Sequence, residues 1–101
     1  MTKIEFLEWM KVRDGKAGGW EVLVEGELIN ANSIPIGGGA FIGIRYVNGK
    51  WQVYEPQERG ADDWIDIETT DENVAFDKLA EEIERKERIY QKRKLREQNE
   101  G

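Results

Sequence analysis

Apolar residues recur at helical spacing near the start of the chain, within residues 2–13. Four of them lie on or beside one stripe of this segment: Ile4, Phe6, Leu7 and Met10. A stripe of this period predicts an amphipathic helix that packs one face on a core. Thr2 and Glu5 also have the spacing of a capping box, in which each side chain binds the other residue's free backbone amide. We therefore expect a first helix over residues 2–13.

A second stripe of helical period begins near Thr70 and Asp71. Its apolar members are Val74, Phe76, Leu79, Ala80, Ile83 and Tyr90. Acidic residues crowd its first turn and basic residues its end, as the helix macrodipole favours. The stripe thins beyond Ile83, so we expect a single domain over residues 1–90 and a basic helical tail over residues 91–101 that protrudes or frays.

Between the two helices, apolar and polar residues alternate with the period of two that is typical of strands. Four segments show this pattern: 20–30, 40–47, 50–55 and 63–68. Asn48-Gly49 predicts a tight hairpin between the second and third segments, because a type I′ turn needs positive φ at both central residues. Gly26 is a candidate bulge or bend in the first segment.

The alternation also assigns side chains to faces of the sheet. Trp51, Val53 and Glu55 are expected on one face of their strand, with Gln52 and Tyr54 on the other. In the last strand, Ile65 and Ile67 are expected to point the same way. The order of elements predicts an α+β domain: a four-stranded antiparallel sheet, connected as a meander, flanked by an N-terminal helix and a long C-terminal helix.

Composition narrows the possible chemistry. The chain has 101 residues, which is enough for one domain, and contains neither cysteine nor histidine. A thiolate nucleophile, the commonest general base and the commonest metal ligand are therefore missing, and we expect no enzyme activity, no cofactor and no bound metal. No apolar run approaches the ~20 residues of a membrane-spanning helix, and no signal peptide opens the chain, so a cytoplasmic protein without membrane contact is expected.

Charge is distributed unevenly along the chain, whose formal net charge is −6. Residues 1–84 contain 18 acids and 8 bases, a balance of −10. Residues 85–101 contain 3 acids and 7 bases, a balance of +4. An acidic body favours a basic protein partner and argues against direct nucleic-acid binding. The basic tail has several interpretations: a solvated helix end, a site of self-association such as a homodimer through the C-terminal helix, or a nucleic-acid or membrane contact.

The densest group of carboxylates spans residues 62–77. It has three interpretations: a solvated face, a docking surface for a basic partner, or a site for a divalent metal ion. Metal binding is disfavoured because the chain lacks the D-x-D-x-D-G spacing of a cation-binding loop. Asp66 and Glu68 are expected on one face of their strand, but the sequence positions no third oxygen ligand beside them. The glycine run at 37–39 opens a strand rather than a helix, so it predicts a turn and no nucleotide site.

One part of the sequence resembles a known family. The stretch GKWQVYEPQERG, at 49–60, is followed by an acid-rich segment and the helix-forming stretch DENVAFDKLAEEIER, at 71–85. Together they are similar to the C-terminal half of small cytosolic immunity proteins from bacterial polymorphic-toxin systems. The resemblance covers residues 49 to about 85. It implies a catalytically inert protein that neutralises a toxin by binding it.

We therefore expect a non-enzymatic inhibitor that occludes a basic partner, such as a nuclease-type toxin. The expected partner contacts are acidic residues with two aromatic anchors: Tyr54, Glu55, Glu58, Asp62, Asp63, Trp64, Asp66 and Glu68. Two alternatives stay open. One is a phage or mobile-element inhibitor of a host nuclease defence system, similar to an anti-CRISPR protein. The other is a self-associating structural or scaffold protein.

Overall fold

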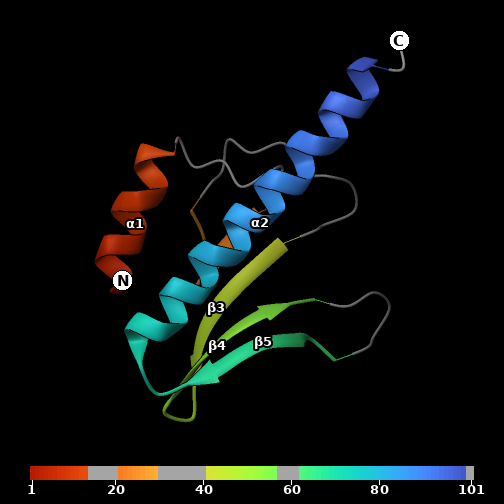
Figure 1. Ribbon diagram of the computed structural model, residues 1–101. Helices are drawn as coiled ribbons and strands as arrows, with labels where there is room; N and C mark the ends of the chain where they lie inside the picture. Colours follow the sequence, from red (N-terminus) through yellow and green to blue (C-terminus); the bar gives the residue numbers. More distant parts are fainter. Residues whose placement is uncertain (14–20, 30–40, 57–61, 100–101) are drawn as a thin grey trace.

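The computed structural model describes residues 1–13, 21–29, 41–56 and 62–99 (Figure 1). In chain order its elements are α1 (Lys3–Val12), β1 (Glu21–Val24), β2 (Glu27–Leu28), β3 (Phe41–Val47), β4 (Lys50–Glu55), β5 (Trp64–Thr69) and α2 (Glu72–Asn99). The chain is an α+β protein, and both expected helices are confirmed.

The expected four-stranded antiparallel meander is wrong, because the sheet has five strands and is mixed. The order across the sheet is β2-β1-β3-β4-β5, and β1 runs parallel to β3 while the other neighbours are antiparallel. The single strand expected over 20–30 is in fact the hairpin β1–β2. Its turn lies at Glu25 and Gly26, whose φ angles are +50° and +82°, so of the two options for Gly26 the chain takes the bend, as a tight turn, and not the bulge.

The hairpin predicted between β3 and β4 is confirmed. Asn48 and Gly49 have φ angles of +52° and +78°, which is the left-handed backbone of a type I′ turn. This turn fixes the register, with Val47 opposite Lys50 and Ile44 opposite Val53. The side chains of β4 alternate between the two faces as expected, with Trp51, Val53 and Glu55 on one face and Gln52 and Tyr54 on the other.

Both helices cover the same face of the sheet (Figure 1). Phe6 of α1 contacts Phe76 of α2 with ring centroids 5.5 Å apart, and Trp51 of β4 contacts the same ring at 5.3 Å. The buried core combines side chains from both helices and three strands: Phe6, Met10, Val22, Val24, Ile42, Ile44, Val53, Ala75, Phe76, Leu79, Ala80 and Ile83. Four members of the expected stripes lie outside this core: Ile4 and Val74 are exposed, Leu7 is partly buried against the core, and Tyr90 is half-buried.

Both helices begin at caps that their local sequence predicts. At α1, the Thr2 hydroxyl accepts a hydrogen bond from the Glu5 amide, and the Glu5 carboxylate accepts one from the Thr2 amide. These two bonds form the expected capping box. At α2, the Asp71 carboxylate accepts a hydrogen bond from the amide of Asn73. Each cap satisfies backbone donors that have no partner inside the helix.

The last strand differs from its expected pattern because it contains a β-bulge. Val53 lies opposite Ile67 and Tyr54 opposite Ile65, so Asp66 is an extra residue between two pairs. Ile65 and Ile67 therefore point to opposite faces, and the expectation that they share one is wrong. A bulge leaves its extra residue unpaired and redirects its side chain. Here it turns Asp66 toward the face that α2 covers, where Asp66 meets Glu82.

Helix α2 continues past the sheet, and its C-terminal half extends beyond the rest of the described chain (Figure 1). The segment 91–99 is helical and continuous with the rest of α2. Among the residues that the structure describes, no helix is long and apolar enough to cross a membrane.

Candidate functional site

The expected contact residues do not form one surface, because they divide between the two faces of the sheet and its β5 edge. Glu55 and Asp66 lie on the face that α2 covers, where both approach Glu82. Tyr54 and Glu68 lie on the opposite face, which we call the open face because neither helix covers it. The expectation that Asp66 and Glu68 share a face is therefore wrong, and its cause is the bulge. Glu58 lies outside the described residues.

Three carboxylates meet where the end of β4, the bulge in β5 and the middle of α2 converge. Each of Glu55, Asp66 and Glu82 places one oxygen within 4.8 Å of the other two. We call these three residues the carboxylate cluster. Trp64 donates a hydrogen bond from its indole nitrogen to Asp66 Oδ1 at 3.2 Å.

Basic side chains of α2 balance two members of the carboxylate cluster. Lys86, only 5% exposed, places its Nζ 2.6 Å from Glu55 Oε1. Glu82, also nearly buried, forms ion pairs with Lys78 at 3.3 Å and Arg85 at 2.6 Å. Asp66 forms no ion pair with any described residue, although carboxylate oxygens of Glu55 and Glu82 lie within 4.8 Å of it.

The electrostatics of the cluster follow from this imbalance. Burial, a hydrogen bond with Glu55 and the charges of Glu55 and Glu82 together raise the pKa of Asp66 to about 7. Burial also acts to raise the pKa of Glu55, but hydrogen bonds from Asp66 and Lys86 outweigh it and lower that pKa. Oδ2 of Asp66 is buried and has no hydrogen-bond partner among the described residues. A protonated Asp66 can donate a hydrogen bond to a neighbouring carboxylate, which an ionised one cannot.

Oxygen ligands in this number suit a divalent cation in principle. In this chain, Lys86 forms an ion pair with Glu55, and Lys78 and Arg85 form ion pairs with Glu82. Three basic side chains therefore already balance the three carboxylates in number. The arrangement therefore acts as a polar link between the sheet edge and α2, rather than as an open cage for a metal ion.

Sequence reasoning missed Glu82 and Lys86, which carry much of this cluster. A signal was present, because these residues lie three and seven positions after Leu79, on the flank of the buried stripe of α2. A charged residue at such a position is buried and needs a partner. The alternation of β4 already placed Glu55 on the same face of the sheet.

The open face carries a chain of side-chain contacts around Tyr54. The Tyr54 ring covers Gly43, where an added Cβ would lie 2.6 Å from a ring atom. The guanidinium of Arg45 lies 4.2 Å from the ring centroid, and this arginine also binds Asp63 at 2.9 Å. Burial raises the pKa of Tyr54. The Tyr54 side chain is therefore half-buried against the sheet and offers little surface to a partner.

The edge formed by β5 is the most accessible part of the expected contact set. Trp64 is 61% exposed, and Asp62 just before it is exposed as well. Ile65 adds an apolar side chain on the open face. Strand β5 pairs with β4, and no other described strand pairs with its outer edge. An exposed strand with free backbone groups and a large aromatic side chain has the character of a binding edge.

Neither protein-family models, curated proteins nor solved structures gave a match to this chain. The likeness to immunity proteins therefore stays a prediction from residues 49 to about 85. Any assignment of function rests on the geometry of the described residues.

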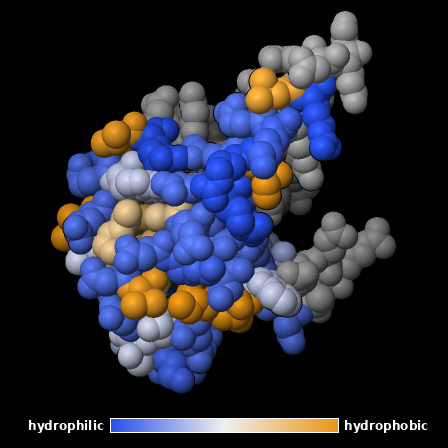
Figure 2. Space-filling model, viewed as in Figure 1, coloured by the Kyte–Doolittle hydropathy of each residue, from blue (hydrophilic) through white to orange (hydrophobic). Residues whose placement is uncertain are grey.

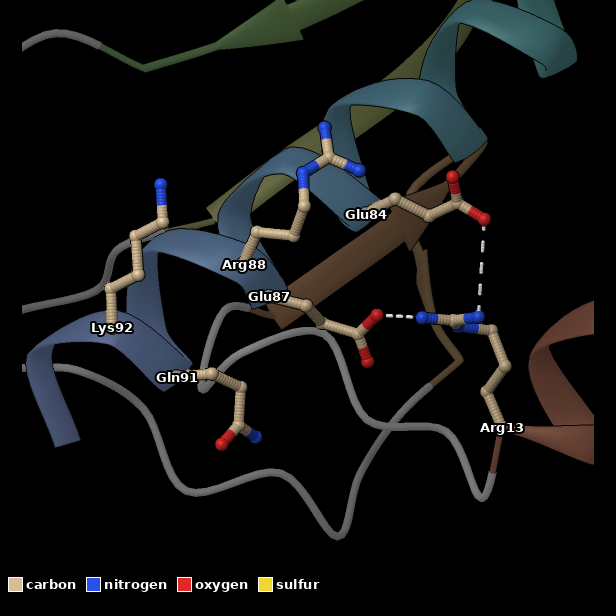
Figure 3. A pocket seen from close by; sticks show the side chains of 6 residues that line it. All are labelled: Arg13, Glu84, Glu87, Arg88, Gln91 and Lys92. Carbon is tan, nitrogen blue, oxygen red and sulfur yellow. Dashed lines mark ion pairs between the residues drawn. The ribbon is translucent and has the colours of Figure 1, made fainter. Parts of the chain in front are cut away.

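A separate hollow of about 580 Å³ lies where the end of α1 approaches α2 (Figure 3). Arg13 forms ion pairs there with Glu84 and Glu87, and its guanidinium lies 4.4 Å from the Trp9 ring centroid. The other lining side chains are Arg88, Gln91 and Lys92. The carboxylates in this hollow already face Arg13, so its main role in the fold is to tie the end of α1 to α2.

Proposed function

We propose that this chain is a non-enzymatic protein inhibitor that binds a basic partner, a nuclease-type toxin, along the β5 edge. The observation that carries the proposal is the exposed Trp64 in an acid-rich edge strand. Tryptophan is among the residues most enriched at binding hot spots, because it buries a large apolar area with little loss of side-chain freedom. Acidic residues around it favour a partner of positive charge.

The proposed set of contact residues is smaller than the set expected from the sequence. Asp62 and Trp64 face solvent at the start of β5, and Asp63 and Glu68 follow the same edge. Asp63 already pairs with Arg45, and Glu68 with Lys50 at 3.4 Å, so both keep only part of their charge for a partner. Asp62 forms no ion pair within the described part of the chain. Trp64 is therefore proposed as the anchor and Asp62 as its main charged neighbour.

Two recognition elements act together in this proposal. A partner segment adds to the outer edge of β5 through backbone hydrogen bonds, as in known cases of strand addition. The carboxylates meanwhile occupy positions that the phosphates of a nucleic-acid substrate would take on the toxin. Both elements block the partner without any chemical step in this chain.

The test needs a nuclease-type toxin encoded beside this chain, and its catalytically inactivated form, once purified, is the binding partner in the assay. Binding is measured by surface plasmon resonance at several salt concentrations. Trp64→Ala should weaken binding by at least ~2 kcal/mol, the loss expected of a hot-spot residue. Asp62→Lys should slow association markedly, since electrostatic steering acts mainly on the on-rate.

A matched control lies at the opposite edge of the sheet. Glu27→Lys, in the exposed strand β2, changes net charge by the same amount as Asp62→Lys but far from β5. If both substitutions slow association equally, only the overall charge matters and the β5 edge is not the docking site. Magnesium-dependent cleavage of DNA or RNA by the chain itself, abolished by Asp66→Ala, would instead make it an enzyme.

A further inference from the structure

The solvent-facing side of α2 carries charges of opposite sign in its two halves. This side lies opposite the buried residues Phe76, Leu79 and Ile83. Its first half is acidic and its second half basic, and all six side chains are exposed: Asp77, Glu81 and Glu84, then Arg88, Lys92 and Arg96. We call these six residues the α2 charge stripe. In the view of Figure 2, the surface over α2 is largely hydrophilic.

The second half of α2 has little support from the rest of the described chain. A helix of 28 residues is about 42 Å long, and the core residues of α2 end at Ile83. Beyond residue 90, each helix side chain that the structure describes is exposed, including Leu95 at 59%. Isolated helical segments of this length are marginal in water, because most helical stability comes from tertiary packing. A binding partner for this part of α2 would supply that packing.

We propose that the partner is a second copy of this chain, with the two α2 helices side by side and antiparallel. The twofold axis passes near residue 86, the middle of the helix. Glu84 of one copy then faces Arg88 of the other, Glu81 faces Lys92, and Asp77 faces Arg96. The twofold symmetry forms each of these three pairs twice.

The charge pattern favours a second copy over other occupants. A nucleic acid would meet the acidic half of the stripe, and a uniformly acidic protein would meet it too. Only a partner with the reverse order of charges matches both halves, and the same helix in antiparallel orientation has that order. Antiparallel helix dipoles are also mutually favourable.

Charges on the stripe are available for this pairing. Glu81, Arg88, Lys92 and Arg96 form no ion pair with other residues that the structure describes. Asp77 contacts the amino group of Met1 and Glu84 lies 4.0 Å from Arg13, but the side chains of both acids stay 63% and 47% exposed. At the ends of the interface, exposed Val74 of one copy comes within about a turn of Leu95 of the other.

Sedimentation velocity of the full chain tests the proposal. At 0.1 M NaCl the protein should form a dimer, and its dissociation constant should rise at least about tenfold at 1 M, as the screening length falls from roughly 10 Å to roughly 3 Å. Arg88→Glu/Lys92→Glu makes the stripe acidic almost throughout, and Glu81→Lys/Glu84→Lys makes it largely basic. Each double variant alone should sediment as a monomer at 0.1 M NaCl.

Mixing the two double variants separates this geometry from other modes of association. In equal amounts they should form a heterodimer, because all six pairs across the interface then join an acidic and a basic side chain. As a control, Lys50→Glu/Glu68→Lys exchanges a charge pair on the open face of the sheet and should leave dimerisation unchanged. Since neither stripe variant touches a core residue, their circular dichroism should match that of the parent chain.

Three results would overturn the proposal. The first is a monomer at all protein concentrations in 0.1 M NaCl. The second is a dimer that both double variants retain. The third is a monomeric parent chain that binds a short single-stranded RNA and loses that binding with Arg88→Glu/Lys92→Glu, which would assign the basic half to nucleic acid.

Discussion

Replacing Asp66 by asparagine should stabilise the protein at pH 8 and leave its stability nearly unchanged at pH 4. The pKa of Asp66 rises from 3.8 to about 7 in the folded chain, so the native state keeps a proton that the unfolded state has already lost. Between pH 3.8 and about 7, the unfolded state binds fewer protons than the native state, so the free energy of unfolding falls as pH rises. The stabilising contribution of the proton is complete below pH 3.8 and lost as pH rises through about 7.

The size of the effect follows from the pKa change and the exposure of the side chain. A shift from 3.8 to about 7 corresponds to ~4 kcal/mol for a group fully removed from solvent. Asp66 is partly accessible to solvent, which weakens its interactions with the neighbouring charges, so about half of that figure is expected. Asparagine has the shape of protonated aspartate and can donate the same hydrogen bond to Glu55. The variant should therefore gain about 2 kcal/mol at pH 8.

The assay is urea denaturation of both proteins at each pH unit from 4 to 8, followed by tryptophan fluorescence. The difference in unfolding free energy between variant and parent should grow with pH and level off above pH 7. Asp62→Asn is the control, because it also removes one carboxylate but lies outside the cluster, so a pH-dependent gain confined to Asp66→Asn assigns the effect to the cluster. A constant difference for Asp66→Asn, or a loss of stability at pH 8, would refute the raised pKa of Asp66.

Two further substitutions and one deletion test the packing. Glu55→Gln should lower the unfolding free energy by about 3 kcal/mol in chemical denaturation, since it removes the carboxylate 2.6 Å from the nearly buried Lys86; a loss below about 1 kcal/mol would contradict the link. Gly43→Ala should cost about 2 kcal/mol by the same measurement, because its Cβ would overlap the Tyr54 ring, and adding Tyr54→Ala should remove that clash. Deleting residues 91–101 should leave the thermal midpoint of dilute, monomeric protein almost unchanged, and a large drop in that calorimetric value would show that this segment packs within the monomer.

The elements of this fold are largely predictable because their signals are local. The capping box at Thr2 and the Asn48-Gly49 turn each depend on residues that are adjacent or three apart in the chain. The turn that separates β1 from β2 was missed because Glu25 takes a left-handed conformation that glutamate seldom adopts. The parallel pairing of β1 with β3 was missed for another reason: alternation assigns faces, but it does not say which strands become neighbours.

The carboxylate cluster was less predictable than the fold. The residues from Ile65 to Glu68 alternate regularly between apolar and acidic, so nothing in this segment indicates an extra residue at Asp66. The bulge depends on how β5 fits against β4 and α2, which is a property of tertiary packing. Because the bulge turns Asp66 toward the helix, Asp66 and Glu55 meet the buried Glu82 and Lys86 of α2. The sequence pattern alone did not show this contact.

The parallel pair β1–β3 also bears on the order in which the chain assembles. Strands β3, β4 and β5 and helix α2 follow one another along the chain and contact their sequence neighbours, so they close short loops. Strand β1 can join only after a longer loop brings it beside β3. The hairpin at Asn48-Gly49 and the docking of α2 should thus form the folding nucleus, with α1, β1 and β2 added late. A destabilising substitution at Val22 should then mainly raise the unfolding rate, whereas one in the Asn48-Gly49 turn should lower the folding rate.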